Sequence, residues 1–168
     1  MKILVDVAML AVLAALGFEL AGLIAAAFQG DHDELLYVLE MTPSTFDVPA
    51  WFIALVVATA AVTWVCLVFV FWPLHRIIWL TVFGFADVGS MLKHSAYACF
   101  GFWGGSTLLF SIFPLVLAGF WTTDASSESA FVPLGLETIF FVMALTFLAI
   151  GRTLERAESV EEENSQFL

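Results

Sequence analysis

The chain has 168 residues, of which 62% are hydrophobic and 12% are charged. Because an ordinary soluble domain is about half apolar and a quarter charged, this composition excludes a water-soluble globular protein and predicts an integral membrane protein. The formal net charge is −11, with only five Lys and Arg residues. Direct binding of nucleic acid is not expected, since it requires clustered basic side chains.

The first apolar run covers residues 4–28 and follows Lys2. It is either a retained transmembrane helix or a secretory signal peptide, because Ala25 and Ala27 resemble a cleavage site. A signal peptide has an apolar region of about 7–15 residues, whereas a membrane-spanning helix needs about 20. The length therefore favours a retained helix. A polar loop with five acidic residues and no Lys or Arg follows at 29–49.

Three further apolar runs predict membrane spans at 50–72, 96–120 and 131–151. Pro73 and the polar residues after it are expected to end the second span. The predicted fold is an all-α, four-helix transmembrane bundle that forms a single domain over residues 1–168.

Residues 77–95, between the second and third spans, contain an apolar stretch of only about nine residues, which is too short to cross a bilayer. They predict a connector that lies along the membrane interface. The alternative is that they extend the neighbouring helices, with a break near Gly84 or Gly89. In the third span, Gly101 and Gly105 form a G-x-x-x-G pair that would let two helices approach closely, and Pro114 predicts a kink.

The fourth helix is expected to continue past Gly151 into water as a charged tail, residues 152–168. One apolar stripe keeps helical spacing across this boundary; its members are Phe147, Ile150, Leu154, Ala157 and Val160. Arg152 and Glu155 are spaced to pair on one face of this helix.

The charges predict the topology. With four spans, the five basic residues fall on one side of the membrane: Lys2, Arg76, Lys93, Arg152 and Arg156. The two loops on the other side carry seven acids and no Lys or Arg. The positive-inside rule then places both termini in the cytoplasm, as in a multi-pass protein of the bacterial inner membrane.

Two carboxylates lie well inside predicted spans, Glu19 in the first and Glu137 in the fourth. At about 1.5 Å per residue, they lie roughly 13 Å and 9 Å from the outer ends of their helices. An acid within a membrane is a candidate functional group, so the pair could bind a proton or cation in a carrier. The alternative is a structural role, in which a protonated Glu is hydrogen-bonded to a neighbouring helix and Glu137 lies near enough to the interface to be solvated. Asp6 lies near the cytoplasmic end, where we expect it to be solvated.

No pattern in the sequence predicts catalysis, a cofactor or a metal site. The three histidines, His32, His75 and His94, are expected to be solvated or interfacial rather than haem ligands. Cys66 and Cys99 lie in apolar runs and are expected to be small buried residues. No nucleophile elbow, P-loop or zinc-protease motif is present. We therefore do not expect an enzyme.

The end of the chain resembles the C-terminal signature of a bacterial four-helix membrane family, domain of unknown function 2975. The similar residues follow the pattern G-R-x-L-x-x-A-x-x-x-x-E-E-N-x-x-F, and here they are Gly151, Arg152, Leu154, Ala157, Glu162, Glu163, Asn164 and Phe167. The resemblance implies no enzymatic activity. Because members of that family are often encoded beside a small helix-turn-helix regulator, it implies a regulatory or sensing role at the membrane.

Two functions follow from these features. The first is a non-enzymatic membrane protein whose cytoplasmic connector and tail bind a partner, either a small regulator or a second copy. The residues expected to bind are Arg152, Leu154, Arg156, Glu162, Glu163, Asn164 and Phe167. The second is a small proton- or cation-coupled carrier that uses Glu19 and Glu137.

Overall fold

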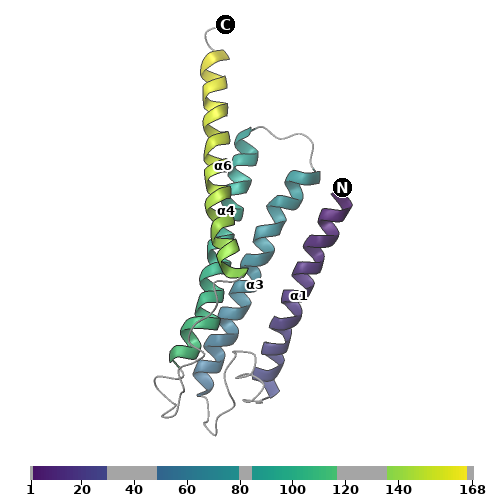
Figure 1. Ribbon diagram of the computed structural model, residues 1–168, viewed down its shortest axis with the longest axis vertical. Helices are drawn as coiled ribbons and strands as arrows, with labels where there is room; N and C mark the ends of the chain where they lie inside the picture. The colour runs from purple at the N-terminus through teal and green to yellow at the C-terminus, as the bar shows by residue number, and fades with distance from the viewer. Residues whose placement is uncertain (1, 30–48, 80–84, 117–135, 166–168) are drawn as a thin grey trace.

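The computed structural model describes residues 2–29, 49–79, 85–116 and 136–165 (Figure 1). Its elements are α1 (Lys2–Gln29), α3 (Ala50–Trp79), α4 (Phe85–Thr107), the π-helical turn η1 (Leu108–Ile112) and α6 (Leu136–Ser165). All the described elements are helical, so the predicted all-α class is confirmed for this part of the chain.

The helices pack in the order in which they occur along the chain. α1 lies against α3, α3 against α4, and α4 against α6, with the α4–α6 contact the most extensive and the α1–α3 contact the smallest of the three. Helices that are consecutive in this series run in opposite directions (Figure 1). α4 is therefore the central element of the part of the bundle that carries the buried core.

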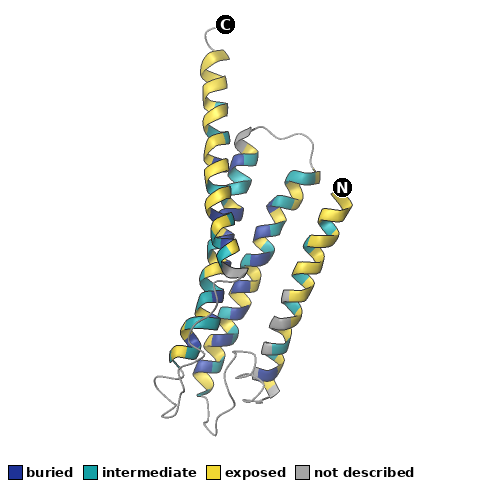
Figure 2. Cartoon of the chain, viewed as in Figure 1, coloured by how far each residue is buried: buried dark blue, intermediate teal, exposed yellow. Residues whose placement is uncertain are grey.

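Three helical segments within the described residues are long and apolar enough to cross a membrane: Ala50–Trp79, Asp87–Val116 and Thr138–Ser165. α1 is a fourth apolar helix of 28 residues beside α3. Buried positions gather on the facing sides of the helices, whereas the outer faces are exposed (Figure 2). Those outer faces carry large apolar side chains such as Phe18, Phe69 and Trp72, which is the pattern of a protein whose solvent is lipid.

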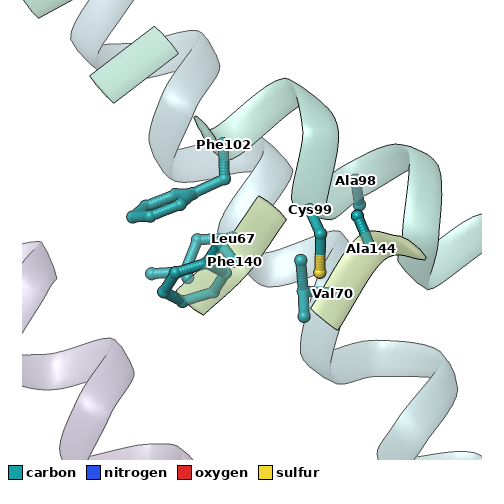
Figure 3. Close-up of a cluster of buried hydrophobic side chains, with 7 residues drawn as sticks. All are labelled: Leu67, Val70, Ala98, Cys99, Phe102, Phe140 and Ala144. Carbon is teal, nitrogen blue, oxygen red and sulfur yellow. The ribbon is translucent and has the colours of Figure 1, made fainter. Parts of the chain in front are cut away.

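The buried core lies where α3, α4 and α6 meet. It is formed by Leu67, Val70, Ala98, Cys99, Phe102, Phe140 and Ala144 (Figure 3). The rings of Phe102 and Phe140 lie with their centroids 4.3 Å apart. Cys99 is fully buried in this cluster, as the sequence predicts, and Cys66 is partly buried beside it. Both are free thiols.

The boundaries of the second and third spans differ from the prediction. Residues 77–79 continue α3 and residues 85–95 form the first half of α4, so most of the predicted connector 77–95 extends the two neighbouring helices. This agrees with the alternative of longer helices; Gly84 lies outside the described residues, and Gly89 lies inside α4 rather than at a break. The reason is packing, because Ser95 and Ala96 are fully buried, and the Ser95 hydroxyl donates to the Val70 carbonyl at 3.2 Å.

Pro73 does not end α3, contrary to the prediction. Proline removes one backbone hydrogen bond and crowds the carbonyl four residues earlier, but the helix continues to Trp79. Pro73 is buried, as is Val70 one turn before it. Tertiary packing around these residues holds the helix together, as neighbouring helices commonly do around membrane-helix prolines.

The glycine pair of the third span allows the close helix approach that the sequence predicts, whereas the kink expected at Pro114 stays a prediction. A Cβ atom at Gly101 would lie 2.7 Å from Cys66 Sγ, and one at Gly105 would overlap the Thr63 side chain, so α3 and α4 are in close contact there. Before Pro114, the helix widens into η1, where the Phe113 N–H donates to the Leu108 carbonyl, five residues back. A π-helical turn is a common way to accommodate a disturbed hydrogen-bond ladder.

Candidate functional site

The polar chemistry of the described chain gathers at one end of the helices. α1 begins there, α3 ends there, α4 begins there, and α6 runs past the others to the C-terminus (Figure 1). The five basic residues therefore lie toward the same end of the molecule, as the charge pattern predicts. Two interhelical polar clusters and the helical extension of α6 make up this end.

α4 and α6 cross at two glycines. A Cβ atom at Gly89 would lie 2.7 Å from the Gly151 carbonyl oxygen, and a Cβ at Gly151 would lie 2.7 Å from the Gly89 carbonyl oxygen. Both glycines are buried. Because any side chain at either position would meet backbone of the other helix, this close approach depends on glycine in both.

An ion pair lies one turn from the glycine crossing. Lys93, four residues after Gly89, places its Nζ 2.7 Å from Oε1 and 2.9 Å from Oε2 of Glu155, which is four residues after Gly151. The two side chains are only 30% and 33% exposed. The Gly-x-x-x-Lys segment of α4 and the Gly-x-x-x-Glu segment of α6 thus form one compact contact, with opposite charges facing each other.

The predicted pair between Arg152 and Glu155 is replaced by this interhelical contact. Arg152 follows the buried Gly151 and is itself exposed. The Glu155 carboxylate faces α4 instead and meets Lys93. Helical spacing identifies only partners within the same helix, and so it predicted Arg152. It does not indicate which residue of a neighbouring helix lies close to Glu155.

A second polar cluster joins α1 to α3. His75 Nδ1 lies 3.0 Å from Asp6 Oδ1, and the Trp79 indole N–H donates to Asp6 Oδ2. Because a carboxylate only accepts hydrogen bonds, the proton of this contact belongs to His75 Nδ1. The Lys2 ammonium lies 5.9 Å from the centroid of the Trp79 ring, within the range of a cation–π contact.

The sequence predicts that Asp6 is solvated, but the structure shows that it is held in this cluster. Its side chain is 18% exposed, and both of its oxygens accept hydrogen bonds from α3. The spacing of His75 and Trp79, one helical turn apart on α3, is the signal that could have indicated a shared acceptor. Nothing local to α1 identifies Asp6 as that acceptor.

We expect Asp6→Ala to loosen α1. The change leaves the Trp79 indole N–H and His75 without their shared acceptor, which typically costs about 1–2 kcal/mol, and the α1–α3 contact is otherwise the smallest of the three main helix contacts. Hydrogen–deuterium exchange of the α1 amides should become roughly tenfold faster, because 1.4 kcal/mol corresponds to about a factor of ten. Asp87→Ala, at an exposed position in the first turn of α4, is the control. Equal exchange in the two variants would contradict a role for Asp6 in holding α1.

The remaining histidines take different places. His94 is exposed, and its Nδ1–H donates to the Ser90 carbonyl at 2.7 Å within α4, which agrees with an ordinary interfacial residue. His32 lies outside the described residues.

The two candidate intramembrane acids are on different helices of the series. Glu19 belongs to α1, which packs against α3, and Glu137 belongs to α6, which packs against α4. The side chains of both residues lie outside the described part of the structure. Their pairing therefore stays a prediction.

The charged tail is helical, as the sequence predicts, at least to Ser165. Within 156–165 only Glu158 is half-buried, and the other residues are exposed. This places Arg156, Glu162, Glu163 and Asn164 on an exposed helix, with Arg152 and Leu154 at its base; Phe167 lies outside the described residues.

Searches with the sequence and structure find no matching family model, no similar curated protein and no similar solved structure. The resemblance of the tail to domain of unknown function 2975 stays a prediction.

Proposed function

We propose that this chain is a non-enzymatic, four-helix protein of the inner membrane that binds a protein partner through the cytoplasmic extension of α6. The observation that supports the proposal most directly is the continuity of α6, a single 30-residue helix from Leu136 to Ser165 whose final ten residues are largely exposed. An isolated helix of only those ten residues would be marginal in water. Here the membrane-embedded part of the same helix supports it.

The extension carries an apolar stripe that the described chain leaves uncovered. Leu154 is half-buried at its base, Ala157 is exposed, and Val160 is 54% exposed. Acidic residues follow the stripe at Glu161, Glu162 and Glu163. An amphipathic helix of this kind binds by laying its apolar residues into a groove of a partner, which would be a small regulator or a second copy.

The topology in this proposal comes from the positive-inside rule. The basic residues lie toward one end of the molecule, and α6 projects from that end (Figure 1). With that end in the cytoplasm, both termini are cytoplasmic and the acidic loops face outward. The resemblance of the tail to domain of unknown function 2975 agrees with a regulatory role at this face.

A truncation that removes residues 159–168 tests the proposal. We expect it to abolish capture of the cytoplasmic partner without changing membrane insertion, because the Lys93–Glu155 contact remains intact. Deleting from Glu155 onward would remove that contact as well and would confuse the two effects. The measurement is in-membrane cross-linking followed by identification of the partner by mass spectrometry.

A matched pair of point variants refines the test. Val160→Glu places a charge on the apolar stripe and should weaken capture at least tenfold. Ser159→Glu adds the same charge to the neighbouring exposed position, away from the stripe, and should leave capture within about a factor of two, as is usual for surface changes. If the two variants captured the same partner equally well, the stripe would not be the binding surface.

A further inference from the structure

His75 is placed to change its charge while it stays bonded to Asp6. Its Nδ1 carries the proton of the 3.0 Å contact with Asp6 Oδ1. A proton that the ring gains or loses is therefore bound at Nε2, for which the described residues supply no hydrogen-bond partner. The His75 side chain is 49% exposed, so the ring can exchange this proton with water. The same contact can thus be either a neutral hydrogen bond or an ion pair.

The charged groups that accompany His75 on α1 and α3 leave Asp6 as its partner. Lys2 of α1 lies 5.9 Å from the centroid of the Trp79 ring, and Arg76 is the exposed neighbour of His75 on α3. Among the described residues, neither of these two cations forms an ion pair with Asp6. The Asp6 side chain, which is only 18% exposed, is consequently paired with a cation only when His75 is protonated.

The other helices do not supply a competing partner. α4 and α6 meet α3 in the buried core, and both carry charged side chains or histidines toward this end. Within the described ranges, none of these side chains forms a hydrogen bond or an ion pair with His75; they are Asp87, Lys93, His94, Arg152, Glu155, Arg156 and Glu158. The charge of His75 therefore acts mainly on its contact with α1.

We propose that the contact between His75 and Asp6 is a pH-sensitive latch that holds α1 against α3. Histidine side chains ordinarily change charge between about pH 5 and 8, and a hydrogen bond between two charged groups is stronger than one with a neutral donor. The latch is therefore strongest where His75 is protonated and Asp6 is ionised, and it weakens as the pH rises through the range in which histidine loses its charge. The proposal does not depend on the partner of the α6 extension.

The latch acts on the helix that is held least firmly. The α1–α3 contact is the smallest of the three main helix contacts, and the two hydrogen bonds that Asp6 accepts join these helices at their polar end. A change in the strength of one of them should alter how often α1 opens. Because about half of the His75 side chain is exposed, solvent screens the charge, and we expect a change of about threefold.

Hydrogen–deuterium exchange of the α1 amides in the full-length protein in detergent tests the latch. The exchange is measured at about pH 5.5 and about pH 8, on either side of the usual histidine range. Each rate is divided by the intrinsic rate of an unprotected amide at the same pH, so that only opening of the helix is compared. In the wild-type protein, α1 should be about threefold better protected at the lower pH.

Three variants assign the effect to the latch. His75→Gln removes the titrating ring, and Asp6→Asn removes the charge that it faces while it keeps an acceptor of the same shape. In both, the protection of α1 should be equal at the two pH values. His94→Gln, at the exposed histidine that bonds within α4, should keep the threefold difference. Equal protection of wild-type α1 at the two pH values, a difference that persists in His75→Gln and Asp6→Asn, or its loss in His94→Gln would overturn the proposal.

Discussion

Replacing Gly89 with Ala should lower the free energy of unfolding in detergent by about 2 kcal/mol, the usual cost of overpacking a close contact. The new Cβ would lie 2.7 Å from the Gly151 carbonyl oxygen and 3.0 Å from Glu155 Cγ. The first of these neighbours is backbone and cannot move aside without separating the helices. The gain of about 1 kcal/mol that Ala brings to a helix interior is too small to offset this separation.

Gly104→Ala is the matched control for this change. Gly104 lies in the same helix, and a Cβ there would meet nothing within 4 Å. The substitution should therefore leave stability unchanged or raise it by up to about 1 kcal/mol. Denaturant titration of both variants in one detergent measures the difference. If Gly89→Ala were as stable as Gly104→Ala, the close crossing of α4 and α6 would be wrong.

Removing one partner of the Lys93–Glu155 pair should have the second large effect. Lys93→Met leaves the Glu155 carboxylate about two-thirds buried without its partner, and Glu155→Gln does the same to Lys93. Each should cost about 1–2 kcal/mol. The estimate is at the low end for a buried pair because solvent reaches about a third of each side chain and screens the interaction.

The charge-reversed variant Lys93→Glu/Glu155→Lys should recover most of that loss of stability. A double-mutant cycle of Lys93→Met and Glu155→Gln should give a coupling energy of about 1 kcal/mol. Arg156→Met, at the exposed position beside Glu155, is the control and should change stability by less than about 0.5 kcal/mol. Additive effects of the two single changes would show that the pair contributes no interaction of its own.

The sequence predicts the helices of this chain well because each is an uninterrupted apolar run, and that signal is local. The close approach at Gly101 and Gly105 is also predicted from a local pattern and is confirmed in the structure. The kink expected at Pro114 stays a prediction, and the helix forms a π-helical turn before that residue. The prediction failed at Pro73 and in 77–95. There the effects of proline and of charged residues on local structure are outweighed by contacts between helices, such as that of Ser95 with Val70. The sequence does not reveal these contacts.

The polar clusters could not be predicted for the same reason. Asp6 is 69 residues from His75, and Lys93 is 62 from Glu155, so neither pair appears in any local pattern. The tail, by contrast, keeps its helical spacing across the membrane boundary, and this was enough to predict a continuous helix past Gly151. Glu19 and Glu137 are predicted as a pair mainly from their depth in the spans, and depth does not indicate which side chains surround a residue.

The crossing at Gly151 gives α6 the mechanics of a lever. Gly151 stands near the midpoint of the 30-residue helix, so the arms on either side are each roughly 20 Å long. Most of the outer arm is exposed, and the inner arm carries Phe140 and Ala144 into the core. A sideways force that moves the outer arm away from α4 would rotate the helix about Gly151 and move the inner arm toward α4 by nearly the same distance. A force applied to the outer arm in water would therefore be transmitted to the apolar core.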